Sequence, residues 1–331
     1  MRLAIHLLVA GQVCVALVLL TVSGLQQSDG IASAQSLTTN VQTASDKAAS
    51  RAAANSEMSR PLPDITAILR EVEIRQRAAE AVQKNYLYLS VETAQEVDSH
   101  GSVKKVTTKE YEDFCLSGVR VRRLMKKDGK SLSMEQAKKE SDRIDKVAAK
   151  SRDKRSKAEA VGKETDPRGN EEIAASRFLE LGRFTNARRV NLSGRDTIVV
   201  DYIGDPHAKT QNRSEDVIRD LVGTVWIDEQ DLMIKRIEGH FVNSFKVGAG
   251  LLINIRKNTS FALEMRKVND EVWLPARVNG HGAARVLLVF NFDGEVQIVY
   301  SNYRRFKTTS TIMPGLSRVE VLGGATETNP Q

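Results

Sequence analysis

The chain has 331 residues, enough to bury one large core or two modest ones, and it carries a formal net charge of +7. Most of the positive excess is local, because residues 138–163 hold ten Lys or Arg against five Asp or Glu. No aromatic residue on which a base could stack occurs between Phe114 and Phe178, and the charges of this segment alternate in sign. We therefore expect no nucleic-acid partner and interpret the segment as a solvated, partly helical insertion.

The N-terminus has the pattern of a Sec signal peptide. A basic residue precedes an apolar run over Leu7–Leu20, and Ala32-Ser33-Ala34 supplies a small-x-small cleavage site. The apolar run is short for a membrane span. We predict cleavage after Ala34, so that residues 1–34 are the signal and Cys14 is lost with it. Cys115 would then be alone, which excludes an intramolecular disulfide and favours a bacterial periplasmic protein over a eukaryotic secreted one.

A linker and a helix come next. Residues 35–63 are rich in Ser, Thr, Ala, Asn and Gln and are predicted to be a disordered linker. Asp64 can cap a helix that extends to about Lys84. Its apolar stripe at i, i+3, i+4 and i+7 is formed by Ile65, Ile68, Leu69 and Val72. We expect this helix to lie across a sheet.

The following segment, residues 86–131, predicts antiparallel strands. Two long alternating strands flank a turn at Asp98–Gly101, and a third strand ends in a turn at Asp128-Gly129. The charged insertion follows, at about residues 133–170. A helix is then predicted at Glu171–Leu181, with its apolar side chains on one side.

From residue 187 onward the sequence predicts strands almost throughout, with one short helix at Ser214–Leu221. One hairpin spans Gly223–Phe241, with Glu229–Asp231 as its exposed turn. The later strands are joined by the short links KNT, NDE, NGHG and DGE, which suit antiparallel neighbours and are too short for crossover helices. A single domain over residues 64–312 is expected, with 313–331 as a flexible tail.

These elements predict an α+β fold, a large curved antiparallel sheet that forms an incomplete β-barrel with a few covering helices. About nine strands offer more apolar surface than two or three helices can cover, so the sheet should curl. The sequence leaves open whether the curl encloses an apolar cavity or a filled core. The candidate cavity-lining residues are Trp226, Ile253, Ile255, Phe261, Leu263, Met265, Leu288 and Phe290.

Catalytic patterns are missing from the sequence. It contains no nucleophile elbow, zinc-protease motif, phosphate-binding loop or dinucleotide fingerprint. None of the five histidines lies within metal-ligand spacing of another, and Cys115 has no histidine beside it. We therefore expect no catalytic residue, no metal site and no cofactor, although a hydrolase of unfamiliar type stays open.

Three segments resemble a known superfamily. They are Gly223–Asp228 (GTVWID), Val272–Pro275 (VWLP) and Tyr300–Phe306 (YSNYRRF). With the signal peptide, the amphipathic helix and the strand pattern, they resemble the LolA/LolB-like lipoprotein carriers over about residues 64–310. More narrowly, the chain is similar to the outer-membrane lipoprotein-sorting proteins of acidobacterial type. The resemblance implies an unclosed barrel with a helical lid that accepts acyl chains, but no position matches the lid-locking arginine of the carriers.

The expected function is therefore a non-enzymatic periplasmic carrier for lipid or lipoprotein acyl chains. An association with the outer membrane stays open. The alternative is an envelope sensor or scaffold that binds a protein partner through Lys138–Lys163. That segment is also where an anionic membrane surface would bind. The sequence does not choose between these partners.

Overall fold

The computed structural model describes seven stretches of the chain: residues 60–98, 100–116, 118–162, 175–211, 213–247, 253–286 and 290–306. The predicted signal peptide, the linker up to residue 59 and the tail from residue 313 lie outside them. So does the end of the charged insertion. Residues 60–63 are described, and they lead directly into the first described helix.

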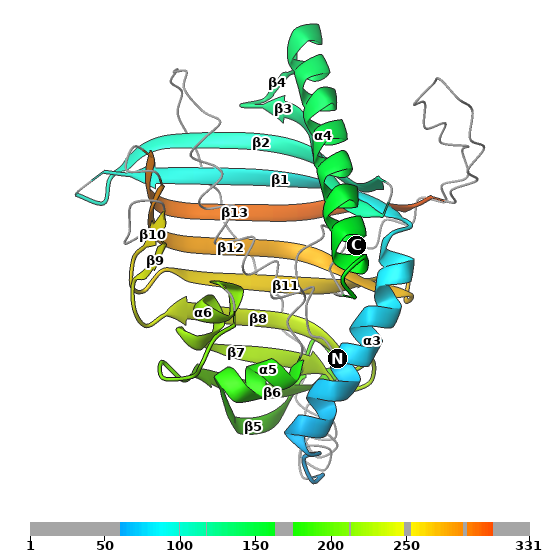
Figure 1. Ribbon diagram of the computed structural model, residues 1–331, viewed down its shortest axis with the longest axis vertical. Helices are drawn as coiled ribbons and strands as arrows, with labels where there is room; N and C mark the ends of the chain where they lie inside the picture. The colour runs from blue at the N-terminus through cyan, green and yellow to red at the C-terminus, as the bar shows by residue number, and fades with distance from the viewer. Residues whose placement is uncertain are drawn as a thin grey trace, which may run out of the picture.

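One large antiparallel sheet dominates the described residues (Figure 1). Its thirteen strands are β1 (Tyr86–Val97), β2 (Val103–Leu116), β3 (Val119–Lys127), β4 (Lys130–Ser131), β5 (Gly182–Leu192), β6 (Arg195–Gly204), β7 (Leu221–Asp228), β8 (Met233–Phe241), β9 (Phe245–Val247), β10 (Ile253–Ile255), β11 (Ser260–Val268), β12 (Val272–Val286) and β13 (Phe290–Arg305). Their order is β4-β3-β2-β1-β13-β12-β11-β8-β7-β6-β5, and β10 pairs with both β12 and β9. The end strands β4 and β5 do not pair among the described residues, so the sheet is not closed into a barrel. The predicted fold class is confirmed.

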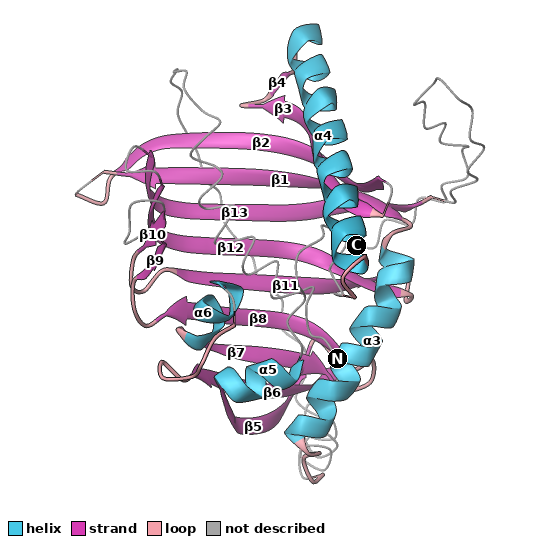
Figure 2. Cartoon of the chain, viewed as in Figure 1, coloured by secondary structure: helices cyan, strands magenta, loops and turns pink. Residues whose placement is uncertain are grey.

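Four helices are described, and they lie outside the sheet rather than between its strands (Figure 2). They are α3 (Ile65–Gln83), α4 (Met134–Glu159), α5 (Ala175–Leu181) and α6 (Arg213–Arg219). Asp64 caps α3 as predicted, because its side chain accepts a hydrogen bond from the N–H of Ala67 at 2.7 Å. None of the described helices combines the length and the apolar character that crossing a bilayer requires.

The main core lies between the sheet and the helices α3, α5 and α6. The apolar stripe of α3 supplies Ile68, Leu69 and Val72, each at most 5% exposed. Phe178 of α5 and Ile218 of α6 join the same cluster. We call the face of the sheet that meets these helices the inner face. Residues on it alternate along each strand with residues of the outer face.

The β3 end of the sheet bends toward α3. The Arg120 side chain from β3 donates a hydrogen bond to the carbonyl of Gln83, the last residue of α3, at 2.9 Å. It also lies over the ring of Tyr88 in β1, 5.1 Å from the ring centroid. The inner face of β3 therefore curves over β1, as the predicted incomplete barrel requires.

Helix α4 packs on the other face of β3. Its Ile144 joins a separate cluster with Val119 and Val121, whose side chains point away from Arg120. The Glu140 carboxylate accepts the N–H of Leu124 at 2.7 Å, so α4 also satisfies a backbone group of β3 beyond its two-residue pairing with β4. The predicted solvated, partly helical insertion is thus a single 26-residue helix over its described part.

Two predicted links are wrong. The sequences NGHG and DGE were expected to be turns, but Gly282 lies inside β12 and Gly294 inside β13, directly opposite each other. A Cβ on Gly282 would lie 2.4 Å from the Oγ1 of Thr259, and one on Gly294 would lie 1.8 Å from the carbonyl oxygen of Gln95. These glycines permit close approach of neighbouring strands rather than a change of direction. The chain passes from β12 to β13 through residues 287–289, which lie outside the described residues.

Candidate functional site

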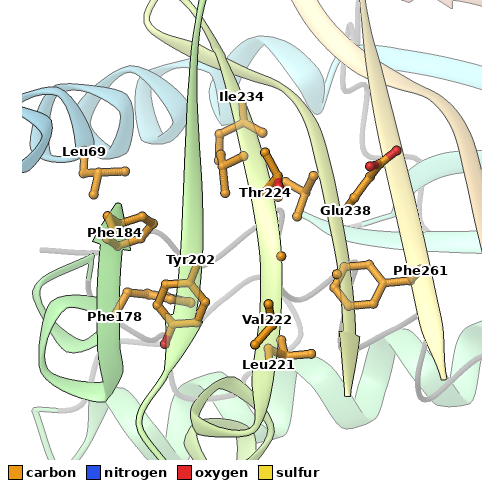
Figure 3. Close-up of a pocket in the computed structure, with 14 residues that line it drawn as sticks. Leu69, Phe178, Phe184, Tyr202, Leu221, Val222, Thr224, Ile234, Glu238 and Phe261 are labelled. Carbon is orange, nitrogen blue, oxygen red and sulfur yellow. The ribbon is translucent and has the colours of Figure 1, made fainter. Parts of the chain in front are cut away.

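A small apolar cavity lies between the inner face and the helices (Figure 3). Its volume is about 40 Å³. That exceeds the roughly 10–15 Å³ that a cavity needs in order to hold one water molecule, but it is far below the volume of an acyl chain. The lining residues come from α3, α5 and strands β5 to β8 and β11. They are Leu69, Phe178, Phe184, Tyr202, Leu221, Val222, Gly223, Thr224, Val225, Ile234, Ile237, Glu238, Gly239 and Phe261.

Two facing glycines explain why space remains at this point. Gly223 of β7 pairs directly with Gly239 of β8, so neither strand places a side chain on the inner face there. The ring of Phe261, from the next strand β11, covers part of the gap. A Cβ on Gly239 would lie only 2.9 Å from the Cζ of that ring. The cavity is therefore the part of this gap that Phe261 does not fill.

The roof of the cavity is helical and apolar. Leu69 comes from α3 and Phe178 from α5 (Figure 3). Phe178 meets the ring of Tyr202 edge-on with centroids 6.2 Å apart, and Phe184 is 5.1 Å from the same ring. Burial raises the pKa of the Tyr202 hydroxyl, because few groups near it can stabilise a phenolate. Tyr202 thus stays a neutral wall residue.

The candidates from the sequence have different positions. Phe261 lines the cavity, whereas Leu263 and Met265 are buried beside it on the same face of β11, and Ile255 is buried in the main core. Trp226 lies on the outer face, where the guanidinium of Arg236 is 5.2 Å from the centroid of its indole ring. The expectation that Trp226 lines the inner wall is therefore corrected. The strand order explains it, since Gly223 and Val225 take the inward positions of β7.

Three further candidates have no described side chain. The backbones of Ile253 in β10 and Phe290 in β13 are placed, but their side chains are not described. Leu288 lies outside the described residues. The structure therefore leaves their predicted lining role as a prediction.

Sequence reasoning missed the helical half of the lining. Leu69 and Phe178 were identified as members of apolar helix stripes but were not counted as cavity residues. A usable signal was present, because a helix that covers an open sheet must direct its apolar stripe into the same space as the sheet. The glycine pair could not be found in this way, since pairing across β7 and β8 depends on the register.

An ionic cluster fixes the chain just before α3. The guanidinium of Arg189 in β5 binds both carboxylate oxygens of Glu229 at 2.7 Å, and it donates to the carbonyls of Arg60 and Pro61. The hydrogen bond from Arg189 lowers the pKa of Glu229. Glu229 is in the turn between β7 and β8, so this turn is in the predicted place. It is half-buried and ion-paired rather than fully exposed, which corrects the expectation.

The same turn is fixed by a second carboxylate. Asp231 accepts a hydrogen bond from the indole Nε1 of Trp273 at 2.8 Å and pairs with Arg195 and Lys267 at 2.9 Å each. Burial opposes ionisation of Asp231, but these donors and charges together lower its pKa. Both ends of the turn are therefore held by charged groups from neighbouring strands.

A polar network occupies the inner face at the opposite end of the sheet. Arg122 of β3 pairs with Glu92 at 3.0 Å and with Asp113 at 3.5 Å, and both carboxylates are at most 3% exposed. The hydroxyl of Ser90 donates to Asp113 at 2.5 Å. Burial raises the pKa of Asp113 although Arg122 opposes the shift. The inner face thus has an apolar part, which α3 and α5 cover, and a charged part, which the strands β1 to β3 form.

Within the described residues, no group of three or more His, Cys, Asp or Glu side chains could hold a metal ion. The described histidines, His100, His207, His240 and His281, are exposed, and none lines the cavity. Most side chains around the cavity are apolar, so the site can enclose an apolar group.

No protein-family model and no curated protein matches the chain. Several solved structures are similar to it, among them the following three. One, from Vibrio parahaemolyticus, is described as a candidate outer membrane lipoprotein-sorting protein domain, with 10% identity, 75% of this chain, 93% of that chain and a TM-score of 0.35. A LolA superfamily protein from Nitrosomonas europaea has 9% identity over 75% of this chain and 96% of that chain, with a TM-score of 0.32. A DUF1329 family protein from Desulfovibrio piger has 8% identity over 74% of this chain and 94% of that chain, with a TM-score of 0.30.

At these identities and TM-scores the likeness assigns no residue a role in this chain. One of the three structures is described as a lipoprotein-sorting domain and another as a LolA superfamily protein.

Proposed function

We propose that the protein is a non-catalytic carrier that binds an acyl chain of a lipid or lipoprotein between the inner face and the helices α3 and α5. The observation that carries the proposal is the apolar cavity over Gly223 and Gly239, which the helices α3 and α5 cover. Apolar burial supplies affinity without any reacting group. Each CH₂ removed from water contributes about 0.8 kcal/mol.

The cavity must enlarge before a chain can enter. At about 40 Å³ it is far smaller than the roughly 300–1,000 Å³ of pockets that enclose small ligands. The roof is held by side-chain packing and by a few hydrogen bonds at the C-terminal ends of α3 and α5, made by Gln83 and Leu181. None of these bonds is a strand–strand pairing, so the middle of the roof can move without breaking the sheet. The ring of Phe261 has to turn away from Gly239 for the same reason. Binding is then a shift toward an open state in which the acyl chain replaces these contacts.

The proposed compartment is the periplasm. Its support is the apolar run and cleavage pattern at the N-terminus, together with the single cysteine expected in the mature chain. A carrier of acyl chains has its donors and acceptors in the membranes on either side of that compartment.

The experiment is to express the full chain with its own N-terminus in a Gram-negative host and to purify it from the periplasm without detergent. Native mass spectrometry and lipid extraction then identify bound lipid, and displacement of a fluorescent fatty acid measures affinity. Val225→Phe should fill the cavity, because Val225 points inward from β7, and should weaken binding at least tenfold. Phe261→Ala should strengthen binding, because it removes the ring that occupies the gap.

The control is Val106→Phe, which makes the same change at a position of β2 that is 52% exposed. It should leave the affinity unchanged. A protein that carries no lipid, and whose fatty-acid affinity is the same in wild type and Val225→Phe, would show that the cavity is ordinary packing space.

A further inference from the structure

Helix α4 exposes a row of lysines that the proposed cavity does not use. We define the lysine ridge as Lys139, Lys146, Lys150, Lys154 and Lys157, all of which are exposed. At 100° per residue these five lie within an arc of about 80° and extend along about 27 Å of the helix.

The ridge is turned away from the sheet. The helix packs through Ile144, Ala148 and Ser151, which are at most 6% exposed and lie roughly 135° around the axis from the ridge. Anchoring on β3 therefore leaves the lysines directed to solvent. They form one straight row because α4 is continuous over 26 residues.

Charge is concentrated in the second half of the helix. Residues 146–157 contain six basic side chains and one acidic, a net charge of +5, whereas residues 134–145 contain three basic and four acidic, a net charge of −1. Favourable interaction with the helix dipole explains lysines in the last turn only. Lys146 and Lys150 lie well before that turn, so the dipole does not account for them.

Two acidic side chains on this side of the helix do not cancel the ridge. Glu135 pairs with Lys139 at 2.6 Å and Asp153 pairs with Lys157 at 2.8 Å, and all four side chains are at least 60% exposed. Exposed pairs of this kind contribute little to stability, so a lysine can exchange its partner for another anion.

We propose that the lysine ridge docks the protein on an anionic phospholipid surface. A long, straight row of positive charges is complementary to a plane of negative headgroups. Lysines act as point charges without the fork geometry that selects a particular phosphate. Each lysine near such a surface contributes about fivefold in partitioning (about 1 kcal/mol). The apolar side of α4 is already packed on β3, so the helix stays on the surface and does not insert.

Nucleic acid fits the ridge less well. Helix α4 has no aromatic side chain for a base to stack on. Docking does not require the proposed cavity to bind lipid. Its use, to hold a carrier close to the membrane that supplies or receives its acyl chain, does rest on the proposed function.

The test is flotation of the purified chain with vesicles of phosphatidylcholine alone or with about 30 mol% phosphatidylglycerol. Wild type should bind the anionic vesicles only, and raising the salt from about 0.1 M to about 0.5 M should release it. Lys146→Glu combined with Lys150→Glu should lower binding at least tenfold. Lys104→Glu combined with Lys257→Glu makes the same change in net charge at exposed positions elsewhere and should lower it less than threefold.

Equal loss in both double variants would overturn the ridge as the docking site, and so would equal binding to neutral and anionic vesicles. Ridge-dependent binding to a single-stranded oligonucleotide or an acidic protein, without binding to vesicles, would also overturn the membrane proposal. The ridge variant should keep its fatty-acid affinity and its circular dichroism spectrum. Val225→Phe should keep vesicle binding, which separates a failure of docking from a failure of the cavity.

Discussion

Two glutamines on the buried side of α3 have opposite environments. Gln76 is 4% exposed, and neither its amide nitrogen nor its amide oxygen has a hydrogen-bond partner. Gln83 is 8% exposed, and its Nε2 donates to the carbonyl of Trp273 at 2.9 Å. Burying an unsatisfied amide costs free energy, whereas a satisfied one contributes modestly to stability. The buried side of the helix thus has an unsatisfied amide at Gln76 and a satisfied one at Gln83.

We predict that Gln76→Leu raises the free energy of unfolding by about 1–2 kcal/mol, because it removes a buried amide that bonds to nothing. Gln83→Leu should lower it by a similar amount, because it removes a bond to the sheet. Urea denaturation followed by tryptophan fluorescence measures both. Two variants with shifts of the same sign would contradict the assignment.

Strands β12 and β13 are long because each passes through a glycine. Gly294 has φ +152°, and its Cα faces the carbonyl of Gln95 in β1. A side chain there would separate β1 from β13. Gly129 likewise has a positive φ, +76°. Unlike Gly294, it has open space around it, because a Cβ there would meet nothing within 4 Å. The two glycines therefore separate the effect of backbone conformation from the effect of close packing.

We expect Gly294→Ala to lower the free energy of unfolding by at least about 2 kcal/mol, since it adds a steric clash to the conformational strain. Gly129→Ala, which adds strain alone, should have a smaller effect, near 1 kcal/mol. Thermal and urea denaturation compare the two. Equal losses would show that conformation alone decides, and that the close contact between β1 and β13 relaxes without cost.

The sequence predicted elements better than it predicted their inward residues. The cap at Asp64 and the stripe of α3 are local patterns, and the helix begins and ends within one residue of the expected bounds. The glycines at 282 and 294 misled because a turn glycine and a close-packed strand glycine look alike until the neighbouring strand is known. Trp226 was misplaced for a related reason, since alternation defines two faces of a strand but does not say which is covered.

Stability of the whole molecule should depend on acid through carboxylates that hold distant segments together. Arg189 lowers the pKa of Glu229 by hydrogen bonding. Burial works against ionisation of Asp231 and Asp201, yet their hydrogen bonds and nearby cations lower both pKa values. A group with a lowered pKa in the folded state stabilises the fold above its ordinary pKa, and that stabilisation is lost as the pH falls through the folded value. Asp113, whose pKa burial raises, acts in the opposite direction.

We therefore predict that the denaturation midpoint is constant above about pH 5 and falls as the pH drops below about 4. Glu229→Gln should be less stable at neutral pH and should show a smaller fall in acid. Glu135→Gln makes the same change at an exposed position of α4 and is the control, with an expected effect on stability within about 0.5 kcal/mol. A Glu229→Gln profile parallel to that of wild type would contradict the role of the Arg189 pair.

The position of β13 affects how the chain can assemble. This last described strand lies between β1 and β12, so the first and last thirds of the domain meet at the centre of the sheet. A chain that emerges N-terminus first completes β1 some two hundred residues before its second partner, β13, exists. Until then β1 presents an unpaired edge, and pairing over such a sequence distance is slow. Sheet assembly is thus completed only when β13 pairs with β1, and the exposed edge of β1 is where a chaperone would protect the nascent protein from aggregation.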